Sequence, residues 1–514
     1  MSNLTINSKH LNRAVRSLYE SGDNDLFPYP FEFRVINHNK KETVGYLSKQ
    51  SVGAYEWGES RNLLIPRDNF VLRNATELDP LDSIFFTALI RQISPKIKSS
   101  RKKFEERSVF SHIIVDSGKL YENKYDDFWL KSVDLVRKRP FVLVTDITDF
   151  YNQIDHHTLE NQLEKCGIEL EVIKSLNNLF DTQNSKSKGI PIGPQGSHIL
   201  AELSLLPLDE YLSDSGFVYC RFFDDIHIFC DSYEDGLEAH NRLATYLDRE
   251  QKLLLSKSKT DIYNRNDFIR KSMIKMRNNP KSKNEERILE ITKNCTGGPY
   301  EQLKIERLSK SDKDGLSKEN IEFALKSYRA GENIDYGDLR FFLRRLRQTG
   351  SPGGIEYIIY NLQFFMPVLI EAFRYIFSAS GNYSGTWQEI GEILGNLICK
   401  GYIRSNDYLL EVAINLFSHI KELNNIEKIL AHYNSSSAMI KREVLLVAKL
   451  ARSASFISFQ KNNYSSMTPW EKRAMIYSSE VLASDERKYW LRKIRESSKT
   501  TYLEKLIIKE VTNN

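Results

Sequence analysis

The sequence predicts an α+β fold class, with a mixed domain in its first half and an all-helical domain in its second half. Short apolar runs rich in β-branched and aromatic residues occur at 141–146, 216–222 and 226–230, as is typical of strands. After Pro280 such runs nearly vanish. From Ser317 onward, apolar residues recur at the spacing of helices that bury one face. The change of pattern indicates two structural classes on one chain.

In chain order we expect an N-terminal extension over residues 1–60, a mixed domain over 61–280 and a helical domain over 281–514. Clusters of Gly, Asn, Ser and Pro separate the helices of the last part, which favours antiparallel pairs and an irregular α-solenoid. No repeated residue signature marks the solenoid. Helical spacing is found over 354–378, 387–400, 407–422, 437–453, 469–482 and 485–496.

The composition is that of an ordinary globular protein. Of the 514 residues, 41% are hydrophobic and 27% are charged, and 73 Lys and Arg against 68 Asp and Glu give a net charge of +5. These values exclude a disordered chain, a collagen, a disulfide-stapled miniprotein and a nucleic-acid coat held by overall charge. Nucleic-acid contacts must come from local patches such as the basic stretch 257–287, although a solvated surface is the commoner origin of such a run.

Cysteine usage and hydropathy indicate a cytoplasmic protein. Five scattered cysteines without a CxxC pair disfavour a disulfide framework or a zinc site and fit a reducing compartment. The N-terminus lacks the charged and apolar pattern of a leader. The most apolar stretch, 355–377, is interrupted by charged residues, so we expect a buried helix there and no membrane contact.

The strongest local signal for chemistry is an Asp pair between two apolar arms, CRFFDDIHIFC at 220–230. The pattern predicts a β-hairpin whose turn carries Asp224 and Asp225. A lone Asp pair is most often only a turn. Here both arms are hydrophobic, so two adjacent carboxylates beside a core cost much free energy unless a cation neutralises them. Carboxylates are the ligands that Mg²⁺ selects.

A third acid of the same kind is Asp146, at the end of the predicted strand 141–146. If this strand pairs beside the hairpin, three carboxylates face one another and hold two Mg²⁺ ions for in-line phosphoryl transfer, with Mn²⁺ as the alternative ion. Asp149 lies beyond the strand end, so we assign it to a local cap.

A glycine- and proline-rich turn precedes a helical pattern in KGIPIGPQGSHILAEL at 188–203. The helix is expected to begin at Ser197, a favoured N-cap residue. Such a turn lets a flat ligand approach the backbone with its phosphates near the helix start. Alone this is weak evidence, because many loops share the pattern.

Together these segments resemble the reverse transcriptase family over roughly residues 60–265. Four ordered motifs are far more specific than any one of them. The similar segments are DITDFY at 146–151 for motif A, PQG at 194–196 for motif B, FFDD at 222–225 for motif C, LLLSKSKTDI at 253–262 for motif D, and Arg73 with LDPLD at 78–82 for the fingers.

The resemblance implies a palm-and-fingers polymerase fold and a role for each matched residue. Asp146, Asp224 and Asp225 would bind the metals, helped by the main-chain carbonyl of Ile147. Phe222 replaces the family's usual Tyr and removes a hydroxyl near the primer end. Tyr151 would lie beneath the sugar of the dNTP and reject ribonucleotides. Gln195 and Gly196 would contact the nucleotide. Lys259 would protonate the leaving pyrophosphate, and Arg73 would bind a phosphate.

Longer stretches resemble the AbiK-like abortive-infection (Abi) reverse transcriptases of bacterial phage defence. These stretches lie at 109–130, 188–203 and 468–490. The resemblance implies that the helical half is HEAT-like and that the enzyme forms homo-oligomers. It also implies DNA synthesis without a template, started from a protein hydroxyl, with the single-stranded DNA product left covalently attached to a tyrosine.

Tyrosine priming is chemically reasonable, because a phenol with a pKa of about 10 is more acidic than a sugar hydroxyl. A priming tyrosine must be mobile enough to reach the metals. We therefore consider first Tyr29, which lies between two prolines that favour an extended loop, and then Tyr46, Tyr55 and Tyr19. For any single candidate, packing against a neighbouring aromatic ring is the commoner role.

Two alternatives stay open. An RNA-templated reverse transcriptase, retron-like or of another defence-associated kind, needs a cleft for a duplex, whereas the helical half begins soon after motif D and leaves little room for a thumb. The other alternative is a catalytically inert nucleic-acid-binding scaffold. The intact acids disfavour it, because a disused site is free to lose its buried charges.

Overall fold

The computed structural model describes residues 4–68, 70–105, 107–184, 187–275, 280–293, 308–330, 334–435 and 437–513. The chain divides into two compact units. The first comprises Met1–Tyr19, Lys40–Asn62 and Thr76–Asn279, and the second comprises Glu20–Asn39, Leu63–Ala75 and Pro280–Asn514. Two N-terminal segments therefore belong to the same unit as the helical half. The three-part division at residues 60 and 280 stays a prediction.

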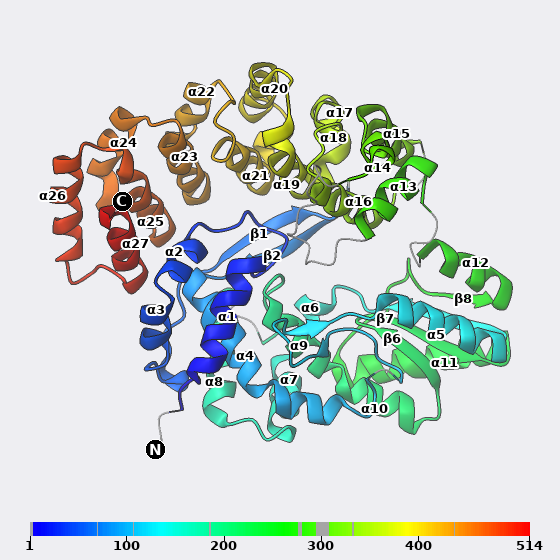
Figure 1. Ribbon diagram of the computed structural model, residues 1–514. Coiled ribbons are helices and arrows are strands. Elements are labelled where there is room, and N and C mark those ends of the chain that lie inside the picture. The colour runs from blue at the N-terminus through cyan, green and yellow to red at the C-terminus, as the bar shows by residue number, and fades with distance from the viewer. Residues whose placement is uncertain are drawn as a thin grey trace. The chain divides into compact units, whose positions relative to one another are not determined.

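An antiparallel four-stranded sheet forms the centre of the first unit, and the strands and the hairpin predicted from the sequence are confirmed (Figure 1). The strand order is β6-β7-β5-β8, and β5 is buried along nearly its whole length because it lies between two other strands. This position explains why its sequence is apolar without alternation. The strands are β5 (Phe141–Asp146), β6 (Val218–Phe222), β7 (Asp225–Cys230) and β8 (Asp261–Asn264).

Helices cover both faces of this sheet. On one face, Val142 and Val144 pack in a cluster with Phe128 of α5 (Tyr125–Lys138) and Phe268 of α12 (Arg265–Lys275). On the other face, α11 (Tyr233–Tyr246) contacts β5, β7 and β8. Because successive side chains of a strand point to opposite faces, β5 contributes to both layers and its end is held firmly in place.

The other elements before the helical half comprise helices and two small sheets. Helix α4 begins at Pro80, and Asp79 caps it by accepting a hydrogen bond from the Leu81 amide at 3.0 Å. The small sheets pair β1 (Arg61–Pro66) with β2 (Leu72–Glu77), and β3 (Ile113–Ile114) with β4 (Tyr121–Glu122). The helices are α1 (Ser8–Ser21), α2 (Glu32–His38), α3 (Lys40–Leu47), α4 (Pro80–Arg101), α6 (Phe150–Gln153), α7 (His156–Lys165), α8 (Leu170–Asn184), α9 (Gln195–Ser204) and α10 (Leu206–Asp214).

In the described part of the chain after Asn264, every regular element is a helix. Helices α16, α19, α21, α23, α25 and α27 pack each against the next in one row, and α17, α20 and α22 pack in a second row (Figure 1). All six predicted helical segments contain helices, whereas α13, α14, α22, α24 and α27 were not predicted. The helices are α13 (Lys283–Lys293), α14 (Lys310–Gly315), α15 (Lys318–Arg329), α16 (Tyr336–Thr349), α17 (Ile355–Tyr360), α18 (Leu362–Phe365), α19 (Leu369–Ala379), α20 (Trp387–Cys399), α21 (Asp407–Phe417), α22 (Ile426–Ala431), α23 (Ala438–Leu450), α24 (Ala454–Gln460), α25 (Pro469–Ser478), α26 (Ser484–Arg495) and α27 (Tyr502–Asn513).

A buried ionic cluster explains why the early segment 20–39 belongs to the helical unit. Glu32 is fully buried and accepts hydrogen bonds from Arg442 Nη2 at 2.9 Å and Arg473 Nε at 3.1 Å. Burial by itself raises the pKa of Glu32, but the two guanidinium groups more than offset it and hold that pKa below its usual value. The carboxylate is therefore charged, and its loss would leave two arginines without their shared partner.

The most apolar helical stretch is part of the protein interior. Among the described residues, one stretch, Leu362–Asn382, is long and apolar enough to cross a membrane, and 72% of its apolar window is buried inside the protein. The burial predicted for 355–377 is thereby confirmed, but the single helix predicted there is wrong, because the stretch is divided into α17, α18 and α19.

Candidate active site

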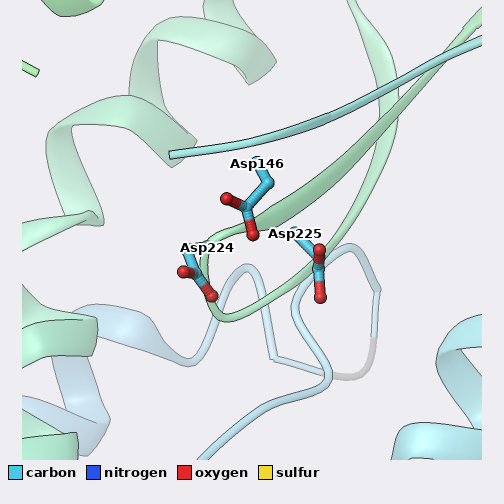
Figure 2. A group of neighbouring side chains, drawn as sticks. All are labelled: Asp146, Asp224 and Asp225. Atoms are coloured by element: carbon cyan, nitrogen blue, oxygen red, sulfur yellow. The ribbon is translucent and has the colours of Figure 1, made fainter. Parts of the chain in front are cut away.

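Three carboxylates meet where β5 ends beside the β6–β7 hairpin (Figure 2). Asp146, the last residue of β5, is paired in register with Asp225, the first residue of β7. Asp224 lies in the two-residue turn that precedes Asp225. One ligand oxygen from each carboxylate lies within 4.8 Å of the other two. The structure thus brings together the three acids that the sequence pattern singled out.

The electrostatics of this cluster fit divalent cations. Burial, followed by the neighbouring charges of Asp225 and Asp146, raises the pKa of Asp224 to about 7, whereas Lys259 opposes the shift. The ammonium group of Lys259 forms an ion pair with Asp146, and its side chain is 42% exposed. One partly solvated lysine therefore faces three carboxylates. A set of clustered carboxylate oxygens that repel one another is suited to Mg²⁺ or Mn²⁺.

The repulsion among the acids predicts a stability change that is independent of catalysis. In EDTA at about pH 8, where Asp224 is ionised, Asp224→Asn should raise the melting temperature, because it removes one of three repelling charges. The same variant should lose most of the stabilisation that Mg²⁺ provides to the unmodified protein. Thermal unfolding with EDTA and with Mg²⁺ measures both effects. Asp149→Asn is the matched control, since Asp149 is exposed and lies outside the cluster. Asn also tolerates the left-handed backbone of that position, φ +49°.

The pH dependence of the same measurement has a definite sign. Folded Asp224, with its pKa of about 7, keeps its proton up to about pH 7, whereas the unfolded carboxyl loses it near its usual pKa of 3.8. The contribution of this group to the free energy of unfolding is therefore fully present at low pH and is lost as the pH rises through about 7. Stabilisation by Mg²⁺ should increase over the same interval. A melting temperature shift with Mg²⁺ that is equal at about pH 5.5 and pH 8 would contradict this assignment.

The turn of the hairpin is held in an unusual conformation. Phe223 has φ +61°, at a turn position where glycine is usual. Its amide donates to Ser111 Oγ at 2.7 Å, and its carbonyl accepts from Arg221 Nη1 at 2.8 Å. Contacts on both sides thus hold the strained residue that positions Asp224.

A buried network of arginines and acids supports the turn from beneath. Arg221 is fully buried and donates to both carboxylate oxygens of Asp209, at 2.9 and 2.6 Å, while its Nη1 lies 3.0 Å from Glu202 Oε2. Arg101 Nη2 donates to the same Glu202 oxygen at 3.2 Å. Sequence patterns did not reveal this network, because Arg101 and Glu202 are 101 residues apart. The one available signal in the sequence was Arg221, a charged residue inside the apolar run 218–222, which indicates a buried ionic partner.

The glycine-rich turn leads into α9, but not as predicted. The helix begins at Gln195 and its N-cap position is Pro194, so the prediction that Ser197 is the N-cap was wrong. Ser197 lies within the first turn, where its amide donates to the Pro194 carbonyl at 3.0 Å. The proline explains the difference, because its fixed φ ends the extended segment and starts the helix earlier.

Tyr151, on the short helix α6, lies beside the hairpin turn. Its ring centroid is 5.1 Å from that of Phe223, with the two planes inclined by 38°. Its hydroxyl is hydrogen bonded to Nδ1 of His198 on α9. The structure therefore brings the segments at 146–151, 194–198 and 222–225 into contact. The partnership with His198 was missed, because a lone histidine beside a glycine-rich turn gives no sequence signal.

Comparison with protein families agrees with this geometry. Residues 83–295 match the model of the family described as reverse transcriptase (RNA-dependent DNA polymerase). This part of the chain is a reverse transcriptase domain. It contains the whole acidic cluster, and the chain is accordingly a nucleotidyltransferase.

Other comparisons add little to the family match. Comparison with curated proteins gives no match. Among solved structures, a telomerase from Candida albicans, in complex with the TWJ fragment of telomeric RNA, matches at 13% identity and a TM-score of 0.33, over 77% of this chain and 70% of that one. Apo telomerase from Candida tropicalis matches at 9% identity and a TM-score of 0.32, over 92% and 74%. These two likenesses are too weak to support any conclusion about this chain.

Close packing of Gly196 predicts a measurable cost for adding one methyl group to the reverse transcriptase domain. A Cβ atom at this position would lie 2.6 Å from Phe86 Cε1 and 2.8 Å from Ile90 Cγ1 of α4. We expect Gly196→Ala to destabilise the protein by about 1–3 kcal/mol through overpacking, as measured by urea unfolding. Gly118→Ala is the control, because a Cβ there has open space around it. Equal effects of the two variants would contradict the close approach.

The other residues predicted to contact the nucleotide or the metals belong to both units of the chain. The Ile147 amide donates to the Asp224 carbonyl at 3.2 Å, so Ile147 lies beside the cluster. Arg73 is on β2 in a part of that strand that belongs to the second unit. Burial, and then the charges of Arg340 and Arg67, lower the pKa of Arg73. The contacts of these residues, Gln195 and Lys259 with a nucleotide or metal stay predictions.

The candidate priming tyrosines differ in exposure. Tyr19, Tyr29 and Tyr46 are 40%, 38% and 37% exposed. Tyr55 is poorly suited to priming, because its hydroxyl donates to Asp82 Oδ1 at 2.8 Å and its ring stacks on Phe85 at a centroid distance of 3.7 Å.

The structure describes only part of the basic stretch 257–287, because Arg277 and the other residues of 276–279 lie outside the described residues. Within it, Arg270 pairs with Asp267 at 3.0 Å and Lys271 donates to the Tyr263 hydroxyl at 2.9 Å. Local pairs of this kind are typical of a solvated surface. The nucleic-acid surface suggested for this stretch therefore stays a prediction.

Proposed function

We propose that this chain is a DNA polymerase of the Abi type, which extends a DNA strand from its own tyrosine without a template and acts in abortive-infection defence against phage. The substrates are dNTPs, the product is single-stranded DNA attached to the protein, and the enzyme works in the cytoplasm as a homo-oligomer. The match to the reverse transcriptase family supports nucleotidyl transfer as the reaction. Synthesis without a template, the tyrosine primer and the role in phage defence are our proposal.

The observation that carries this proposal is the short connection between the sheet and the helical half. Helix α12 is the first helix after the last strand, and its Phe268 is buried in the core cluster of the sheet. The next helix, α13, belongs to the second unit. Across the described residues 265–275 and 280–293 there is thus no separate bundle that could act as a thumb around a template duplex. This arrangement supports synthesis without a template.

The chemistry proposed is nucleotidyl transfer. The residues that would hold two Mg²⁺ ions are Asp146, Asp224 and Asp225, with the main-chain carbonyl of Ile147. Bound metal supplies a lowered pKa for the attacking hydroxyl and neutralises charge on pyrophosphate. The attacking hydroxyl gives up its proton to solvent and its oxygen bonds to the α-phosphorus, while the bond from that phosphorus to pyrophosphate breaks. Lys259, which already lies at Asp146, donates a proton to the leaving pyrophosphate.

The helical half supports the HEAT-like and oligomeric part of the proposal. Its two rows of successively packed helices form the kind of extended surface that repeat proteins use for binding. We assign it contacts between copies and a wall for the product strand. For priming we retain Tyr29, with Tyr46 and Tyr19 as the other exposed candidates.

The test is incorporation of labelled dNTPs by purified protein with Mg²⁺, without template or primer. We expect labelled DNA that enters a denaturing gel as free strands only after protease digestion, and a DNA-bearing peptide that mass spectrometry assigns to one tyrosine. Replacement of that tyrosine by Phe should abolish the product. Incorporation that requires added RNA and a primer would instead make the protein an RNA-templated reverse transcriptase. Absence of incorporation under both conditions would favour the inert scaffold.

A further inference from the structure

We infer that His198 is a positioning residue that orients the Tyr151 ring and thereby increases the selectivity of the active site for deoxynucleotides. The inference rests on the proposed function and on the role that the family resemblance implies for Tyr151, whose ring would act as a gate: it would lie beneath the sugar and exclude a 2′-hydroxyl. It adds a residue that holds this ring in place, and it makes selectivity depend on a hydrogen bond as well as on the size of the ring.

The position of Tyr151 requires such a restraint. Helix α6 has only four residues, Phe150–Gln153, and it follows Asp149 with its left-handed backbone. A helix of one turn has little stability of its own. The Tyr151 hydroxyl is hydrogen bonded to His198 Nδ1, and the ring is inclined against Phe223 of the catalytic turn. The hydrogen bond acts at the far end of the side chain, where it limits the swing of the ring most strongly.

His198 can act as a restraint because it is itself rigidly placed. It lies in the first turn of α9, where Gly196 allows close packing against α4. Its imidazole ring stacks on that of His112, with centroids 4.7 Å apart and planes inclined by 7°.

His112 in turn connects the gate to the buried ionic network. His112 Nδ1 lies 3.5 Å from Glu202 Oε1, and Glu202 is fully buried between Arg101 and Arg221. The same Arg221 holds the carbonyl of Phe223. One buried network therefore supports both the ring of Tyr151 and the turn that carries Asp224. The same set of buried side chains would thus position the residues that contact the sugar and the reacting phosphate.

The size of the effect follows from the worth of one hydrogen bond. A net contribution of that kind changes an equilibrium by about three- to tenfold. A sterically excluding ring loses selectivity when it can move by a fraction of an ångström, whereas binding of the deoxynucleotide itself requires no such exclusion. Loss of the bond should therefore improve ribonucleotide binding and leave deoxynucleotide binding nearly unchanged.

The experiment measures the affinities of dATP and ATP by calorimetry, with Ca²⁺ in place of Mg²⁺ to limit turnover, and separately the incorporation ratio with Mg²⁺. We expect His198→Ala and Tyr151→Phe each to lower the preference for dATP by about three- to tenfold. The double variant should be no worse than either single variant, because both remove the same bond. His198→Asn, whose amide can replace Nδ1, should stay within about twofold of the original ratio. His157→Ala is the control, since His157 is an exposed histidine whose side chain is 80% accessible.

The outcomes separate this inference from the function on which it rests. If Tyr151→Ala lowers the preference for dATP while His198→Ala and Tyr151→Phe leave it unchanged, the positioning role is wrong and the gate stands. If Tyr151→Ala itself leaves the preference unchanged, Tyr151 is not the gate and both assignments fail. Additive effects in the double variant would also overturn the inference. Melting temperatures identify any variant that fails to fold, and Tyr151→Phe and His198→Asn retain the packing of the original side chains.

Discussion

Replacing Asp224 with Asn should lower nucleotide incorporation by about a thousandfold or more, while the protein becomes more stable in EDTA. The loss of rate is expected because the variant removes one of three clustered carboxylates that would hold the metals, and stabilisation of charge in phosphoryl transfer depends on those ions. The gain in stability is expected because the pKa of Asp224 is raised by burial and by the neighbouring acids. Single-turnover incorporation and thermal unfolding on the same preparation measure the two effects.

The opposite signs of these effects make the prediction specific. A variant that merely unfolds loses activity and stability together. Asp149→Asn, three residues beyond Asp146, should change neither quantity by more than about twofold in rate or about 0.5 kcal/mol in stability. Undiminished incorporation by Asp224→Asn would show that the cluster is not the catalytic centre, and the nucleotidyl-transfer chemistry proposed for it would have to be withdrawn.

Replacing Arg221 with Met should destabilise the first unit by about 3–5 kcal/mol. The guanidinium group is fully buried between Asp209 and Glu202, and its removal leaves two carboxylates without their main partner. Urea unfolding gives the magnitude. Arg137→Met is the control, because Arg137 is 64% exposed and its ion pair with Asp134 is long, at 3.6 Å. A pair of that kind is worth at most about 1 kcal/mol.

A compensating variant tests whether unpaired charge is the cause. Adding Asp209→Asn to Arg221→Met should recover part of the lost stability, because the buried carboxylate no longer has to be charged or to take up a proton. Incorporation should stay low in the compensated protein, since the Phe223 carbonyl still lacks its donor and the turn that carries Asp224 is less well held. If stability and full activity both returned, the buried network would not be needed to hold the turn that carries Asp224, and the connection between the two would be wrong.

Much of this fold was predictable from local sequence patterns. The apolar run 141–146 and the arms around Asp224 and Asp225 predicted a buried strand and a hairpin, and helical spacing predicted most of the second half. These predictions succeed because burial of one face imposes a period of 2 or 3.6 residues that is readable within a short window. The short helices α22 and α24 were missed, since six or seven residues hold too few turns to display that period.

Patterns of single residues were less informative about how elements meet. Ser197 has the side chain of an N-cap, but Pro194 begins the helix earlier. Glu32 lies in the N-terminal segment, yet its carboxylate belongs with Arg442 and Arg473 in the helical unit. No local pattern specifies such a partnership, because the charges that satisfy one another are separated by hundreds of residues.

The sequence by itself therefore determined the class of the chain, its three clustered acids, the strands that carry them and most helices of the second half. Asp146, Asp224 and Asp225 are recognisable because charged residues at the ends of apolar strands violate the ordinary preference for buried side chains. Only the tertiary structure decided what surrounds them: the buried network of Arg221 and the contact of His198 with Tyr151. The physical reason is that hydrophobic burial is periodic along the chain, whereas the pairing of buried polar groups depends on distances in space between residues that the chain keeps far apart.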